Sequence, residues 1–128
     1  MQKKQFAAVI TCMDGRVQLP VSQYLRERFK VDYVDTITEP GPVGLLAQKP
    51  ETSEVQGIWK RLEISIYKHH AGDIAVVAHE DCAGNPVSQK EQMVQLEKSV
   101  DLIKSKYDSL RVIGLWVNDQ WQVQEVFS

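Results

Sequence analysis

Hydrophobic and polar residues follow one another along the chain in blocks that predict strands and helices in turn. Phe6 to Cys12 is a short apolar run that ends before Asp14-Gly15, as buried strands often do. The apolar positions of the next segment recur at helical spacing between charged residues, and they are Leu19, Val21, Tyr24, Leu25 and Phe29. This spacing predicts an amphipathic helix with Pro20 in its first turn. β-Branched residues then favour a second strand over Val31 to Thr38.

The segment after the second strand has the composition of a loop. Glu39-Pro-Gly-Pro-Val-Gly44 holds two prolines and two glycines, which interrupt regular structure, and 48–52 is a polar connection. Ser53 is then predicted to cap a helix that runs to about His70. Ile74 to His79 is predicted as a third buried strand.

The last third of the chain predicts one more helix and two more strands. Asp81 to Pro86 has the turn residues of a loop. Ser88, with Glu91 three residues later, forms a capping-box pattern that starts a helix. Arg111 to Val117 reads as a fourth strand, and Trp121 to Phe127 as a fifth that runs antiparallel to it after a turn.

This order of elements predicts an α/β fold in a single domain over residues 1–128. We expect a mostly parallel four-stranded sheet with helices on its faces, plus a C-terminal antiparallel strand. Ligands of such sheets bind at the carboxyl ends of the strands, near a topological switch point. Cys12 ends the first strand and His79 ends the third. If these two strands are neighbours, both side chains emerge at the same edge.

Composition and charge narrow the classes of function. The chain has 128 residues with 43% hydrophobic and 25% charged residues, which is ordinary for a soluble domain. A net charge of −2 gives no basic surplus for binding nucleic acid or an anionic membrane. No apolar run approaches the ~20 residues of a membrane span. The stretch from Met1 to Met13 weakly mimics a signal peptide, but Asp14 and Arg16 interrupt it, so we expect a cytoplasmic protein.

The two cysteines indicate a metal site. Two are too few for a disulfide scaffold, and a metal or catalytic role is the usual alternative inside a cell. Cys12, His79 and Cys82 offer two thiolates and one imidazole, a set that suits Zn²⁺ and leaves a fourth tetrahedral position open. The alternatives are two small core residues or a redox pair, although the cysteines are not in a Cys-x-x-Cys arrangement.

Asp14 and Arg16 are candidates for a functional pair beside this metal. Zn²⁺ with two thiolates and a neutral histidine has no net charge, so it acidifies water less than an all-histidine site does. Asp14 lies two residues from Cys12 and could itself take the fourth zinc position. Arg16 could hold that carboxylate in a bidentate ion pair and keep it off the metal. The simpler alternative is a turn at Asp14-Gly15 with Arg16 as a surface charge.

At these residues the chain resembles a known family. Cys12-Met-Asp14-Gly-Arg16 followed by His79-Glu-Asp-Cys82 resembles the zinc signature of the β-class carbonic anhydrases. The resemblance implies that Cys12, His79 and Cys82 bind zinc and that Asp14 and Arg16 are the catalytic dyad. It implies reversible hydration of CO₂, a small uncharged substrate, to bicarbonate by zinc hydroxide. It also implies a homodimer or a higher homo-oligomer.

The chain also departs from this family at the second strand's end and after Cys82. At the end of the second strand an Arg-Asn-Ala-Gly-Asn-like stretch is usual, but this chain has Thr38-Glu-Pro-Gly-Pro42. Glu39 near the zinc would disfavour hydroxide or act as a base. Ala83 follows Cys82, where many members have glycine. We therefore keep two further hypotheses: a zinc hydrolase of the same fold that acts on carbonyl sulfide or carbon disulfide, and a non-catalytic zinc-binding regulatory protein whose fourth zinc position is closed.

Overall fold

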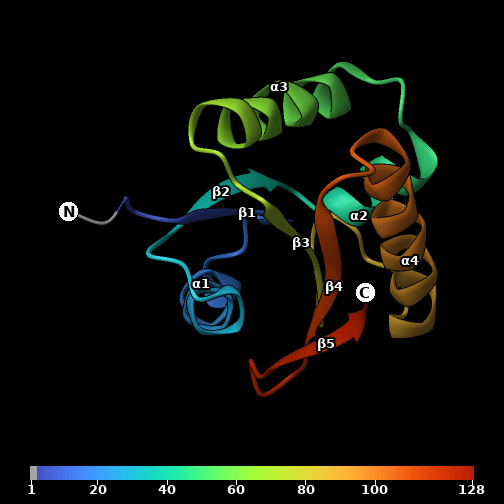
Figure 1. Cartoon of the computed structure of the whole chain (residues 1–128). Coiled ribbons are helices and arrows are strands. Elements are labelled where there is room, and N and C mark those ends of the chain that lie inside the picture. The colour runs from blue at the N-terminus through green and yellow to red at the C-terminus, as the bar shows by residue number, and fades with distance from the viewer. Residues whose placement is uncertain (1–2) are drawn as a thin grey trace.

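Five strands form one sheet in the order β2-β1-β3-β4-β5 in the computed structural model of the chain, which describes residues 3–128 (Figure 1). The strands are β1 (Phe6–Cys12), β2 (Tyr33–Glu39), β3 (Asp73–His79), β4 (Arg111–Val117) and β5 (Val123–Phe127). Strands β1 to β4 are parallel, and β5 is antiparallel to β4. The predicted fold class is confirmed. Met1 and Gln2, part of the stretch compared with a signal peptide, lie outside the described residues.

Four helices cover the two faces of the sheet. They are α1 (Gly15–Phe29), α2 (Pro42–Gln48), α3 (Ser53–Lys68) and α4 (Gln89–Lys106). Helix α1 lies alone on one face, and the other three helices cover the opposite face (Figure 1). Each face has its own apolar core, because consecutive residues of the buried strands point to opposite sides. No helix within residues 3–128 is both long and apolar enough to cross a membrane.

Strand β1 lies at the topological switch point. The chain leaves it to form β2 on one side and returns to form β3 on the other, so β1 and β3 are neighbours. In their register Ile10 lies beside Val76. The carboxyl ends of both strands therefore reach the same edge of the sheet, which is where the sequence placed Cys12 and His79.

Three sequence predictions about helices are wrong in detail. Helix α2 begins inside the segment 39–44 that was predicted as a loop. It can start at Pro42 because a proline at the first helical position loses only an N–H that the helix leaves free. Ser53 is the first residue of α3 and not its cap, since Thr52 occupies the cap position without a side-chain hydrogen bond. Pro20 lies inside α1, beyond the first turn.

The predicted start of α4 is confirmed, and the predicted start of β5 is wrong. Ser88 Oγ accepts a hydrogen bond from the backbone N–H of Glu91 at 3.1 Å and so caps α4. Strand β5 begins at Val123, so Trp121 belongs to the turn and not to the strand. Asn118 shapes this turn: its Oδ1 accepts from the backbone N–H groups of Gln120 and Gln122 at 2.9 and 3.0 Å.

Candidate metal centre

The two cysteines and His79 meet at the carboxyl edge of the sheet. Cys12 ends β1, His79 ends β3, and Cys82 lies in the loop that follows β3. Their ligand atoms all lie within 4.8 Å of one another, although the two cysteines are 70 residues apart. The three residues are 4%, 1% and 5% exposed, respectively. Parallel strands at a switch point thus bring two soft sulfurs and one nitrogen together in a place shielded from water.

His79 is oriented as a metal ligand. Its Nδ1 lies 2.8 Å from the backbone oxygen of Glu80, and a neutral ring that donates there keeps its lone pair on Nε2. That Nε2 is buried and has no hydrogen-bond partner among residues 3–128. A buried nitrogen without a partner is costly, so the ring has a free acceptor that a cation would satisfy. Gln92 Nε2 donates to the backbone oxygen of His79 at 2.8 Å and helps to fix the strand end.

The sulfur atoms have the spacing that zinc requires. Two sulfurs at ~2.3 Å from a tetrahedral zinc lie about 3.8 Å apart, and Sγ of Cys12 and Sγ of Cys82 are 3.8 Å apart. The contact with Cys82 lowers the pKa of Cys12 to about 4, although burial acts in the opposite direction. The same contact, together with burial, raises the pKa of Cys82. Without a cation the two sulfurs therefore share one proton, and the donor set fits Zn²⁺.

Two glycines let the loop that carries Cys82 approach the loop after β2. Gly41 has φ +61°, and a Cβ on it would lie 2.5 Å from Cβ of Asn85. A Cβ on Gly84 would lie 2.6 to 2.9 Å from atoms of Pro40, two of them backbone. Real Cβ atoms do not approach so closely, so only glycine permits this contact between the loop after β2 and the loop after β3. The contact keeps Cys82 beside the end of β1.

Hydrogen bonds from Arg16 fix the position of the Asp14 carboxylate. Asp14 is the N-cap of α1, and its Oδ1 accepts from the backbone N–H of Arg16 at 2.9 Å. The Arg16 guanidinium donates to the same carboxylate from Nη2 at 2.7 Å and from Nε at 3.1 Å. These hydrogen bonds lower the pKa of Asp14 to about 2. Within the described chain, the cluster of mutually close metal-ligand atoms does not include Asp14.

Arg16 has two further contacts that sequence reasoning missed. Its Nη2 donates to the backbone oxygen of Asp81 at 3.2 Å, and its Cζ lies 4.4 Å from the ring centroid of Trp121. The sequence predicted a loop from Asp81 and placed Trp121 at the start of the fifth strand, with no contact between either residue and Arg16. No local pattern links residues 16 and 121, because only the fold brings them together.

A cavity of about 390 Å³ opens beside Cys12. It is lined by Cys12, Met13, Asp14, Pro40, Ala83 and Gly84. Most of these residues are apolar, so the space suits a small uncharged molecule.

Glu39, which was expected to influence the metal, has its carboxylate engaged by a residue of α3. Its carboxylate pairs with Nη2 of Arg61 from α3 instead of standing free beside the sulfurs. Nor does Glu39 line the cavity, although the neighbouring Pro40 does. At the end of β2 it is therefore Pro40 that lines the cavity, while Gly41 contacts Asn85 of the loop after β3.

Known proteins support the family and the fold. Residues 2–127 match the family described as "Putative carbonic anhydrase". A comparison with curated proteins finds no match. A β-carbonic anhydrase of Trichomonas vaginalis is 17% identical, with a TM-score of 0.64 over 100% of this chain and 86% of that one. A tetrameric β-carbonic anhydrase of Sordaria macrospora is 10% identical, with a TM-score of 0.64 over 97% and 82%. A carbonic anhydrase of Glaciozyma antarctica is 12% identical, with a TM-score of 0.61 over 93% and 80%.

Proposed function

Because the chain belongs to this carbonic anhydrase family and has the β-carbonic anhydrase fold, we propose that it is a zinc-dependent lyase that reversibly hydrates CO₂ to bicarbonate. Cys12, His79 and Cys82 would hold one Zn²⁺, and Asp14 with Arg16 would form the catalytic pair. Zinc, when bound, supplies a Lewis acid that makes a nucleophile available from water near neutral pH. The residues of this chain contribute binding, orientation and charge.

The cavity and Asp14 suit this reaction. CO₂ is small and uncharged, and the apolar side chains of Met13, Pro40 and Ala83 would receive it without a cost for desolvating a charge. Asp14 also lines the cavity. Its ionised carboxylate can accept a hydrogen bond from the attacking water and so direct a lone pair of that water toward the carbon. Arg16 holds the carboxylate in place for this task.

The observation that carries the proposal is the position of Asp14. A carboxylate so close in sequence to Cys12 would be attracted to a bound dication and would close the fourth position. Arg16 instead engages both of its oxygens. Three ligands with a restrained carboxylate leave room for water, which is the arrangement of a catalytic and not a purely structural zinc.

Stopped-flow CO₂ hydration by zinc-loaded protein, from neutral to alkaline pH, tests the proposal. We expect hydration that disappears when zinc is removed with a chelator and returns when it is restored. The Cys82→Ser variant, which lacks one proposed ligand, should stay inactive under the same loading. A zinc-replete protein without hydration activity at any of these pH values would reject the anhydrase function. Sulfide release from carbonyl sulfide or carbon disulfide would then support the hydrolase. Inactivity toward CO₂, carbonyl sulfide and carbon disulfide would support the non-catalytic regulatory zinc protein.

The resemblance implied a homodimer or a higher homo-oligomer, and we propose that two copies meet through the outer edge of β2. Within residues 3–128, β2 pairs only with β1, so its other edge has unpaired backbone groups. One solved neighbour is a tetramer. Tyr33 on β2 and Ile64 on α3 are 50% and 57% exposed. A two-fold contact would cover both side chains and pair the strand edges.

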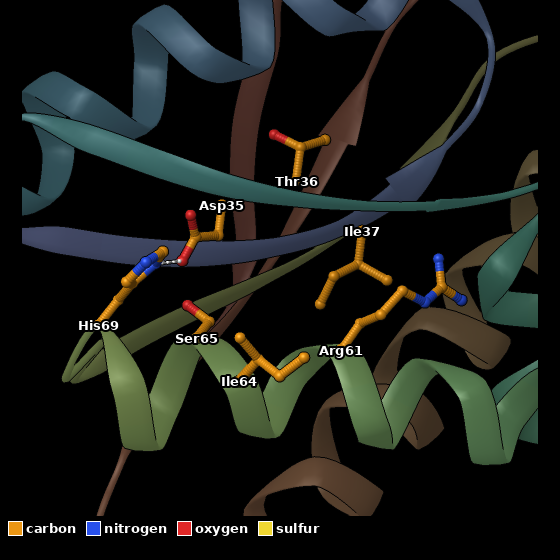
Figure 2. Close-up of a pocket in the computed structure, with 7 residues that line it drawn as sticks. All are labelled: Asp35, Thr36, Ile37, Arg61, Ile64, Ser65 and His69. Carbon is orange, nitrogen blue, oxygen red and sulfur yellow. Dashed lines mark hydrogen bonds and ion pairs between the residues drawn. The ribbon is translucent and has the colours of Figure 1, made fainter.

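A groove of about 260 Å³ runs between β2 and α3 along this surface. Figure 2 shows Asp35 and His69 at one end and Arg61 at the other, with the side chains of Ile64 and Ser65 from α3 between them. His69, just after the end of α3, has its Nδ1 2.6 Å from Asp35 Oδ2. Ser65 Oγ is buried and lacks a hydrogen-bond partner in the described chain. A second copy would give this groove an occupant.

The expected compartment remains the cytoplasm, because a site that needs two reduced thiols is favoured there.

A further inference from the structure

Arg16 is held from more than one side. Asp14 accepts two of its side-chain hydrogen bonds, from Nε and Nη2, and the backbone oxygen of Asp81 accepts another. The ring of Trp121 lies against the guanidinium, with Cζ 4.4 Å from the ring centroid. An arginine over an indole face is the most favourable of the common cation–π pairs. The Arg16 side chain is nevertheless 46% exposed, so water competes for its donors.

The backbone of Trp121 is strained where the fold places its ring against Arg16. Trp121 has φ +59°, a left-handed backbone conformation that a large side chain rarely adopts. The turn imposes this conformation through hydrogen bonds to Asn118: the backbone N–H of Trp121 donates to the Asn118 oxygen at 3.0 Å, and Asn118 Oδ1 accepts from two more backbone N–H groups of the turn. A glycine or asparagine would suit this backbone better. The strained residue carries the ring that covers Arg16.

The turn is itself attached to the helix that bears Arg16. Arg28 of α1 donates from Nε to Glu125 of β5 at 2.8 Å, and Trp121 packs partly buried against the core under α1. The Arg28–Glu125 ion pair and this packing therefore hold the β4–β5 hairpin against α1 and place the Trp121 ring beside the guanidinium.

We propose that Trp121 is a positioning residue, whose ring fixes the Arg16 guanidinium so that it keeps Asp14 in its working orientation and off the metal. The catalytic role of Asp14 rests on the proposed function, but the restraint of Arg16 by Trp121 does not. The carboxylate of Asp81 contributes little, because it is 79% exposed and lies 3.4 Å from Nη1. The backbone oxygen of Asp81 and the Trp121 ring are the contacts that matter.

Hydrogen exchange of the Arg16 Nε–H, measured by NMR on the zinc-loaded protein, tests this role directly. That proton lies in the bond to Asp14, so its exchange rate follows how often the pair opens. We expect exchange to become roughly tenfold faster in Trp121→Gly and in Trp121→Asn, which remove the ring but suit the backbone. Trp121→Phe should lie between, and Asp81→Asn should stay close to the native rate. Trp59→Phe, on the opposite face of the sheet, is the matched control.

Trp121→Gly and Trp121→Asn should also lower kcat for CO₂ hydration with little change in KM, because the ring orients Asp14 through Arg16 and does not line the cavity. An exchange rate within twofold of native in a folded Trp121→Gly protein would overturn the positioning role, whether or not the native protein hydrates CO₂. If neither Trp121→Gly nor Trp121→Asn folds, the comparison of the native protein with Trp121→Phe tests the positioning role instead. An Arg16 Nε–H that shows no upfield ring-current shift in the native protein, and exchanges equally fast in both, would contradict the proposal.

Discussion

At the scale of single residues, metal binding at the proposed site depends on the protonation of its two cysteines as well as on the positions of its three ligand atoms. Cys12 and Cys82 lie close enough for one proton to serve both sulfurs. The pKa of Cys12 is lowered to about 4 and that of Cys82 is raised. At neutral pH the metal-free pair is therefore one thiolate and one thiol, and zinc must displace the remaining proton.

Zinc loading at neutral pH should therefore release about one proton from the two thiols, where two ordinary cysteines would release nearly two. Cys12 has already lost its proton well below this pH, because its lowered pKa favours the thiolate; Cys82 has not, because its pKa is raised. Isothermal titration calorimetry of zinc binding in buffers of different ionisation enthalpy measures this number. Although burial acts to lower it, the pKa of His79 is also raised by its contact with Cys12, so the count is made at a pH where NMR shows a neutral His79 ring. Release of two protons there would show that the sulfurs titrate independently.

Arg16→Ala should lower CO₂ hydration by roughly 100-fold, because the released Asp14 carboxylate would bind the metal or lose its orientation. Arg16→Lys should recover only part of this loss, since an ammonium cannot engage both oxygens as the guanidinium does. Stopped-flow kinetics with zinc content checked in each sample measures the effect. Arg111→Ala is the control, because Arg111 pairs with Asp73 at the opposite end of the strands. Unchanged turnover in Arg16→Ala would contradict the role of the pair.

At the scale of elements, the sequence predicted those strands and helices that have a regular pattern of apolar residues. The five strands and three of the helices follow from apolar patterns, and the ends of β1 and β3 brought Cys12 and His79 to one edge. Helix α2 was not foreseen, because the prolines and glycines of residues 39–44 are typical of loops and the helix depends on packing against α4. The Trp121 contact was not foreseen either, because it depends on a left-handed turn and on the return of β5 beside α1.

The contact between the two metal-site loops makes Gly84 sensitive to substitution. Gly84→Ala should destabilise the protein by ~1–3 kcal/mol and weaken zinc binding, because its Cβ would meet the backbone of Pro40 and push the loops apart. Thermal unfolding and competition with a zinc chelator measure the two effects. Gly72→Ala is the matched control, since its Cβ would have no atom within 4 Å among the described residues. Equal behaviour of the two variants would show that the loop contact does not position Cys82.

At the scale of the whole molecule, the free edge of β2 is the surface that a second copy would cover. Ile64→Glu should shift the protein toward monomer by at least about tenfold in the dissociation constant, because a dimer would bury the added charge. Sedimentation at several micromolar concentrations measures this constant. Val94→Glu, an equivalent change at an exposed site on α4, should leave it unaltered. A native protein that sediments as a monomer throughout would exclude the dimer.

The central claim is that distant parts of this chain place two sulfurs and one imidazole around a single zinc with a fourth position open to water. Zinc K-edge X-ray absorption on the zinc-loaded protein tests it most directly. We expect one zinc per chain with two sulfurs at ~2.3 Å and two nitrogen or oxygen ligands at about 2.0 Å, and one sulfur fewer in Cys82→Ser. A native protein that binds no stoichiometric zinc, or that coordinates it through fewer than two sulfurs, would contradict it.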